Sequence, residues 1–139
     1  MSKEALVTAV KQIVAQSREG DVDGALEGYK ALFSSAEFAA NKPEDQRQAL
    51  KLLILQKRPG NVQPSAPLVE AHRAAIAPLT ELVSAHNEPE DYEMLGLCHL
   101  HIGNDQAASN MFRQGLTLER ARNPASDLCG RLMTRVSQI

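Results

Sequence analysis

One spacing of three residue types occurs twice in this chain and constrains its fold more than any other feature. In each copy a glycine is followed by an alanine after five residues and an aromatic residue after nine, namely Gly20, Ala25 and Tyr29 and then Gly103, Ala108 and Phe112. A glycine lets the chain turn tightly, a small alanine lets two helices approach closely, and an aromatic ring one turn later fills the space beyond. The repetition therefore predicts two similar helix-turn-helix units.

Apolar residues recur at helical spacing along most of the chain, which predicts an all-α protein. Hydrophobic residues make up 43% of the sequence but aromatic residues only 4%, so the core is expected to be aliphatic, as suits closely packed helices better than a β-sandwich. We expect seven helices: one ending at Gly20, one from the turn at 20–23 to about 36, one from 43 to 57, one over 68–86, two flanking Gly103 within 89–122, and one over 124–139. Pro78 should bend or split the fourth of these helices.

Three prolines in similar contexts predict where helices begin. Pro43, Pro89 and Pro124 each follow an asparagine within two residues and precede acidic residues. Proline is tolerated at the first helical position, and acidic side chains favour the positive end of the helix dipole. The intervals between these prolines are 46 and 35 residues, so the middle segment is expanded. Its extra length includes residues 58–67, which hold three prolines and a glycine and are expected to form a surface loop.

The segment 89–116 resembles the tetratricopeptide repeat, a 34-residue helix-turn-helix unit. Besides the glycine, alanine and aromatic described above, the resemblance rests on Tyr92 and on the pair Leu95 and Gly96. His99 departs from the pattern, since the family usually has an aromatic ring there, and we expect a partly buried structural histidine. The N-terminal copy lacks the Leu-Gly pair in its first helix.

This resemblance implies a right-handed α-solenoid of about three antiparallel helix pairs plus a C-terminal capping helix, in a single domain spanning 1–139. The expected units are about 3–38, 43–87 and 89–122, and the expected cap is 124–139. The cap sequence is amphipathic, as a terminal repeat requires. Its apolar side would carry Leu128, Cys129, Leu132, Met133 and Val136. Its water-facing side would carry Asp127, Arg131, Thr134, Arg135 and Gln138.

The resemblance also implies a non-catalytic protein-interaction module, because the concave groove of such arrays usually holds a peptide segment or helix of a partner. In the third unit the groove positions are Glu90, Glu93, Leu97, Leu100 and His101. In the middle unit, matched through the prolines, they are Arg47, Lys51, Ile54 and Leu55. A groove that is basic in the middle and acidic and apolar at its end suits an amphipathic helix or a charged extended segment.

Residues able to support catalysis or bind a metal are too scattered to predict either function. Cys98 and His101 lie three apart on one helical face, but a metal site needs three or four converging ligands and the sequence has no second cluster. Neither cysteine has a histidine and an orienting third group at a recognisable spacing, and no phosphate-binding glycine motif occurs. We therefore expect no metal, no cofactor and no enzymatic activity.

Two other functions stay open. Three short repeats leave apolar end faces, so the chain could instead be a self-associating assembly subunit, such as a homodimer. A more remote alternative is an accessory enzyme or ligand-binding protein with a pocket formed by the loop at 58–67.

Composition narrows the setting in which the protein is expected to work. A chain of 139 residues fits one domain of ordinary size, and a net charge of -2 disfavours general nucleic-acid binding. The N-terminus lacks the features of a signal peptide, and no window has the 18 or so apolar residues of a membrane helix. Cys98 and Cys129 lie at apolar-periodic positions and are expected to be buried free thiols. We expect a cytoplasmic protein without membrane insertion.

Overall fold

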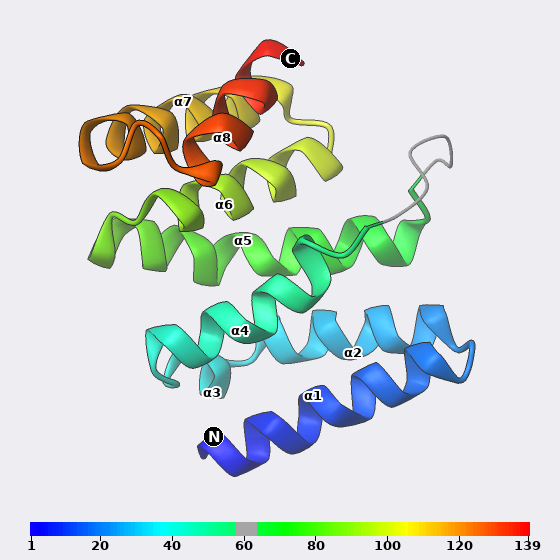
Figure 1. The fold of residues 1–139 in the computed structure, drawn as a ribbon. Coiled ribbons are helices and arrows are strands. Elements are labelled where there is room, and N and C mark those ends of the chain that lie inside the picture. Colours follow the sequence, from blue (N-terminus) through cyan, green and yellow to red (C-terminus); the bar gives the residue numbers. More distant parts are fainter. Residues whose placement is uncertain (58–63) are drawn as a thin grey trace. The chain divides into compact units, whose positions relative to one another are not determined.

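The computed structural model of the protein describes residues 1–57 and 64–139, and within these residues it contains eight helices and no strand (Figure 1). They are α1 (Lys3–Arg18), α2 (Val22–Ser34), α3 (Ala36–Ala39), α4 (Pro43–Ile54), α5 (Ala66–His86), α6 (Pro89–His101), α7 (Asp105–Arg122) and α8 (Asp127–Ser137). The prediction of an all-α protein is confirmed. The contacts divide the chain into two compact parts, an N-terminal part, Met1–Pro78, and a C-terminal part, Leu79–Ile139, which are described separately below.

In the N-terminal part, α1 and α2 pack against each other and bury an apolar core. The α2 residues Tyr29 and Phe33 stack with ring centroids 5.7 Å apart, and Phe33 meets the edge of Phe38 at 5.2 Å. Phe38 lies on α3, a single helical turn that the sequence analysis did not predict. The hydroxyl of Ser35 caps this turn by accepting a hydrogen bond from the Phe38 N–H at 3.1 Å. The short helix thus places one fully buried aromatic ring against α2.

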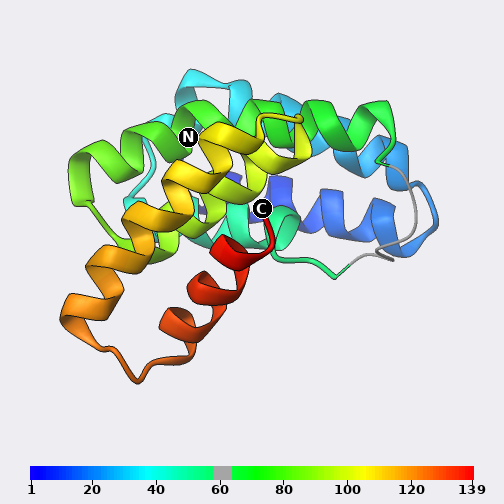
Figure 2. The ribbon, with the colours of Figure 1, turned by 90° about the horizontal axis from the view of Figure 1, so that it is seen from above.

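In the C-terminal part, α6 packs closely against α7, and α8 folds back toward α7 after the loop at 123–126 (Figure 1 and Figure 2). Two close helical hairpins are therefore present, α1 with α2 and α6 with α7, as the repeated spacing predicts. The third pair expected for the middle segment stays a prediction.

The turns of these two hairpins have the same chemistry. Gly20 and Gly103 have positive φ angles of 93° and 83°. Residues with a Cβ atom rarely adopt this backbone conformation, whereas glycine adopts it readily. In each turn the glycine N–H donates to the carbonyl three residues back, and the next N–H donates to the carbonyl five residues back. The side chains of Asp21 and Asn104 then cap the following helix by accepting from the N–H three residues on. The turn and cap predicted at 20–23 are confirmed.

Each hairpin also contains one glycine on which a large side chain of the other helix rests. A Cβ atom built on Gly96 of α6 would lie 2.5 Å from the ring of Phe112 on α7. A Cβ built on Gly28 of α2 would lie 2.8 Å from the side chain of Ile13 on α1. The α6/α7 hairpin has a second close glycine on its other helix, because a Cβ built on Gly115 of α7 would lie 3.1 Å from Cβ of Tyr92 on α6.

Several predicted boundaries need correction. Pro43 and Pro89 do begin α4 and α6, but Pro124 does not begin α8, which starts at Asp127. Ser126 is a better cap, because its hydroxyl accepts from the Cys129 N–H at 3.0 Å and donates to the Glu119 carboxylate at 2.7 Å.

The other corrections concern the middle segment. The helix expected to reach residue 57 ends at Ile54. Pro78 does not split α5, which runs unbroken from Ala66 to His86. Proline removes a single backbone hydrogen bond, and its neighbours Ala75 and Leu79 are fully buried, so packing outweighs the loss. Of the loop expected at 58–67, residues 58–63 lie outside the described residues, and the last two residues already belong to α5.

Candidate interaction surface

The predicted groove positions on α6 differ widely in exposure. Glu93 is fully buried and Leu97 is buried, whereas Glu90 and His101 are half-buried and Leu100 is 39% exposed. The Nδ1 atom of His101 lies 2.9 Å from the Leu97 carbonyl oxygen, so this side chain is engaged with its own helix. Of the five positions, Leu100 alone is in the exposed class.

Glu93 is instead the centre of an ion cluster with the C-terminal helix. Arg131 of α8 donates two parallel hydrogen bonds to its carboxylate, from Nε to Oε2 and from Nη2 to Oε1, both at 3.1 Å. Arg135, one turn further along α8, donates from Nε to Oε2 at 2.8 Å. The guanidinium of Arg135 also lies over the Phe112 ring, 6.0 Å from its centroid. One buried carboxylate therefore connects α6 to two arginines of α8.

The burial of Glu93 explains why both arginines are needed. A buried carboxylate without hydrogen bonds or a cation is strongly unfavourable, and a two-pronged arginine contact is the geometry that satisfies it best. Hydrogen bonds to Glu93 raise the pKa of Arg131, with smaller Coulombic contributions from Glu93, Glu90 and Asp127. The arginine side chains remain 48% and 28% exposed, so each spans from solvent to the buried carboxylate.

This cluster was not predicted from the sequence. Arg131 and Arg135 were expected on the water-facing side of the cap, and Glu93 was expected in the groove. A signal was nevertheless present, because Glu93 directly precedes the apolar run of residues 94–98, and the two arginines are one helical turn apart.

Three of the groove positions predicted on the middle unit lie on α4, and the fourth, Leu55, caps its C-terminal end. Ile54 is buried, Arg47 and Lys51 are half-buried, and Leu55 is 39% exposed. Arg47 and Lys51 both interact with other groups of the chain. Next to Lys51, Leu52 is 44% exposed, so α4 carries two exposed leucines three residues apart beside two basic side chains. The prediction from sequence did not include Leu52.

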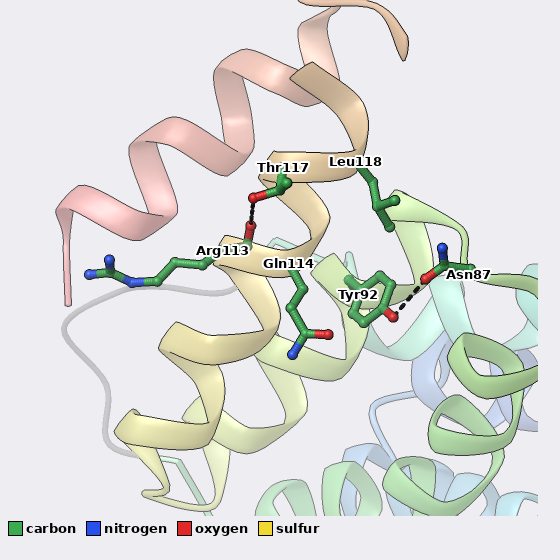
Figure 3. Close-up of a pocket in the computed structure, with 6 residues that line it drawn as sticks. All are labelled: Asn87, Tyr92, Arg113, Gln114, Thr117 and Leu118. Carbon is green, nitrogen blue, oxygen red and sulfur yellow. Dashed lines mark hydrogen bonds between the residues drawn. The ribbon is translucent and has the colours of Figure 1, made fainter. Parts of the chain in front are cut away.

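A shallow hollow of about 320 Å³ lies on the C-terminal part (Figure 3). It is lined by Asn87, Tyr92, Arg113, Gln114, Thr117 and Leu118. Its hydroxyl groups are already engaged, since Tyr92 donates to the Asn87 side chain at 2.8 Å and Thr117 donates to the Arg113 carbonyl at 2.9 Å. Figure 3 shows the guanidinium of Arg113 extending away from Asn87 and Tyr92, where it bonds Ser109. The hollow offers little polar chemistry to a ligand.

The two thiols and the histidine beside Cys98 are wholly or partly buried. Cys98 and Cys129 are buried free thiols, as the sequence predicts, and burial raises the pKa of Cys98 above its ordinary range. His99 is half-buried, and desolvation lowers its pKa. Within residues 1–57 and 64–139, no three histidine, cysteine or acidic side chains gather where they could hold a metal ion.

Across the part of the chain that the structure describes, no helix is both long and apolar enough to span a bilayer. Comparisons of the chain with protein-family models, with curated proteins and with solved structures find no match.

Proposed function

We propose that this protein is a non-catalytic interaction module, in which a tetratricopeptide-like array of helix pairs binds a peptide segment or helix of a partner protein. The observation that carries the proposal is the surface of α4, where Leu52 and Leu55 are exposed beside Arg47 and Lys51. We call these four residues the α4 surface. Exposed leucines next to partly exposed cations suit an amphipathic partner that brings apolar and acidic side chains together.

Spacing along the helix supports this assignment. Arg47, Lys51 and Leu55 follow one another at intervals of four residues, so they lie along one face of α4, and Leu52 adjoins them. An amphipathic helix that docks on such a face would place its own apolar residues at intervals of three and four. The charged residues would then set the orientation of the partner and speed its approach, while the leucines supply most of the affinity.

Two features of the hairpins support the tetratricopeptide-like arrangement. The α1/α2 and α6/α7 hairpins share the same glycine turn and the same side-chain cap. Gly96 packs against Phe112 at the positions through which segment 89–116 resembles the repeat. The absence of catalysis is part of the proposal and is supported by the burial of both thiols.

Binding variants on α4 would test the proposal. A partner is first captured from the native cell with the wild-type protein and identified, and its affinity is then measured with purified components. Leu52→Glu with Leu55→Glu, and separately Arg47→Glu with Lys51→Glu, should each weaken that affinity at least tenfold, a loss of about 1.4 kcal/mol.

The control is Lys11→Glu with Lys30→Glu at exposed positions of α1 and α2, which makes the same change of net charge as the variant of Arg47 and Lys51. Circular dichroism must show that every variant retains its helix content. If the partner binds both α4 variants as tightly as the control, the assignment of the α4 surface is wrong.

A second candidate function is self-association into a structural assembly. The observation in its favour is that α8 leaves Met133 51% exposed, and Ile139 just beyond it is 46% exposed. A second copy could cover these side chains in a symmetric dimer. Light scattering at micromolar concentration separates the two functions, because an assembly subunit forms oligomers that Met133→Glu dissociates, whereas an interaction module of the proposed kind is monomeric.

A further inference from the structure

The C-terminal helix α8 packs against α7 and buries few of its own residues. Of its eleven residues, Cys129 and Leu132 are the two that are buried, and the other apolar side chains are half-buried or exposed. It is also held by the pair of arginines on Glu93, by the contact of Arg135 with the Phe112 ring, and by the hydrogen bond of its capping residue Ser126 to Glu119 of α7. By contrast, α6 buries nine of its thirteen residues. The charged hydrogen bonds to Glu93 are therefore the specific contact of α8 with α6.

Those hydrogen bonds also define what can replace α8. If α8 moved away and nothing replaced it, the carboxylate of Glu93 would lose both of its cations. The residues that follow Glu93 in α6 include Met94, Leu95 and Leu97, which are buried and apolar. An unpaired charge in such a place is strongly destabilising. Any segment that takes the place of α8 must therefore bring at least one cation to Glu93.

The acidic character of this end of α6 favours the same kind of occupant. Glu90 lies one turn before Glu93, is half-buried, and acts electrostatically on Arg131. An incoming basic segment would meet both carboxylates. An acidic segment would be repelled by them, so the chemistry here is opposite to that of the α4 surface.

We propose that α8 is an internal, exchangeable ligand of α6, and that the partner which replaces it is an amphipathic helix with two basic residues four positions apart and a leucine between them on the buried side. This proposal rests on the proposed function in its general form, an interaction module that binds a partner's helix, and not on the α4 surface. It specifies the partner's chemistry from α8 itself, in which Arg131, Leu132 and Arg135 form such a set.

Thiol labelling of the full-length protein can follow the exchange. Cys129 lies on the buried side of α8, and Cys98 lies in the buried part of α6. The probe is a synthetic peptide of residues 124–139 in which Cys129→Ser removes the thiol. The control peptide carries Arg131→Gln and Arg135→Gln in addition. Mass spectrometry then measures the labelling rates of Cys129 and Cys98 separately.

The expected result is that the arginine peptide raises the labelling rate of Cys129 several-fold and leaves that of Cys98 unchanged, while the control peptide has no effect. The proposal is overturned if Cys129 and Cys98 are labelled at one common rate with or without peptide, since α8 would then open with global unfolding alone. It is equally overturned if the control peptide works as well as the arginine peptide.

A tethered helix competes at a high effective concentration, so a second measurement is needed for a weakly binding peptide. In the full chain with Arg131→Gln and Arg135→Gln, α8 no longer pairs with Glu93, and a fluorescently labelled arginine peptide should bind more tightly than it does to the wild type. Adding Glu93→Gln should abolish this gain. Equal binding to all three proteins, or no binding to any, contradicts the proposal.

These outcomes are separable from those for α4. The peptide experiments involve residues of the C-terminal part, whereas the α4 surface belongs to the N-terminal part. If the α4 variants bind the captured partner normally while the peptide exchanges with α8, the α4 assignment falls and the exchange stands. If the α4 variants weaken binding but no peptide displaces α8, only the exchange falls.

Discussion

The ring of Phe112 rests on the backbone of Gly96, and it leaves no space for a side chain there. A Cβ atom added to Gly96 would lie 2.5 Å from Cε1 and 2.6 Å from Cδ1 of that ring. Phe112 is itself 1% exposed, so the ring is confined on its other sides as well. The contact fixes how closely α6 and α7 approach.

We predict that Gly96→Ala destabilises the protein by about 1–3 kcal/mol, because overpacking outweighs the roughly 1 kcal/mol by which alanine favours a helix over glycine. Urea unfolding followed by circular dichroism measures the change. Phe112→Leu should reduce the effect of Gly96→Ala in a double-mutant cycle, because it removes the atoms that the new methyl group meets.

Gly130→Ala is the matched control for this substitution. Gly130 is also within a helix, but a Cβ built there meets nothing within 4 Å. Alanine should therefore stabilise the protein by about 0.5–1 kcal/mol. If Gly96→Ala and Gly130→Ala shift the stability in the same direction, the close approach of Phe112 is not what makes glycine necessary at position 96.

The free energy of unfolding should fall more when the two arginines of the Glu93 cluster are removed than when its carboxylate is removed. Arg131→Gln with Arg135→Gln leaves a buried carboxylate without a cation and should cost about 3–5 kcal/mol. Glu93→Gln leaves two partly exposed arginines that water can solvate, so it should cost less, about 1–3 kcal/mol. Chemical denaturation compares the two variants. Arg120→Gln, at an exposed position of α7, should change stability by less than about 0.5 kcal/mol. The reverse order of costs would contradict the burial of Glu93.

His99 should make the protein less stable in mild acid. Burial lowers its pKa below the ordinary value of 6.5, so the unfolded chain takes up a proton on this side chain at a higher pH than the folded chain does. Its contribution to stability is therefore complete above about pH 6.5 and is lost as the pH falls below that value. Unfolding free energies at pH 7.5 and pH 5.5 should differ less in His99→Gln than in the wild type. An identical pH dependence in the two proteins would show that His99 titrates normally.

Both thiols should be unreactive in the native protein. Cys98 and Cys129 are buried, and burial also raises the pKa of Cys98, which disfavours the reactive thiolate. A water-soluble disulfide reagent at pH 8 should react slowly with the native chain and rapidly with two thiols per chain in denaturant. A thiol that reacts natively at the rate of a free cysteine would place that residue at the surface.

The parts of the fold that could be predicted from the sequence depend mostly on residues that are close together in the chain. Gly20 and Gly103 each require a left-handed backbone, and the side chain that follows each glycine caps the next helix, so both hairpin turns follow from a few adjacent residues. The extra turn α3 was missed because its four residues are too few to show an apolar periodicity. The prediction that α8 begins at Pro124 was wrong because Ser126 is the better cap, and its hydroxyl also donates to the Glu119 carboxylate on the preceding helix.

The candidate surface was harder to predict because exposure depends on which helix covers which face. A helical repeat pattern places Glu93 on one side of α6, but it does not reveal that two arginines 38 and 42 residues later reach back to it. Long basic side chains can lie on the water-facing side of their own helix and still bind a buried acid. On α4 the sequence pattern predicted a groove position at Ile54, which is buried, and did not include Leu52, the most exposed leucine of the helix.

The two hairpins differ in which of their helices could be exchanged with a helix of the other hairpin. Counted from the turn glycines, Ile13 and Gly96 occupy the same position, seven residues before the turn, yet one is the large side chain and the other is the small one. Counted in the same way, Tyr29 of α2 corresponds to Phe112, and Met111 of α7 corresponds to Gly28. A chimera that paired α6 with α2 in this register would still set an aromatic ring on Gly96, whereas α1 paired with α7 would set Ile13 against Met111 at the position where α2 has Gly28. The lack of space for Ile13 beside Met111 therefore disfavours one of the two wrong helix pairings that a nascent chain could form.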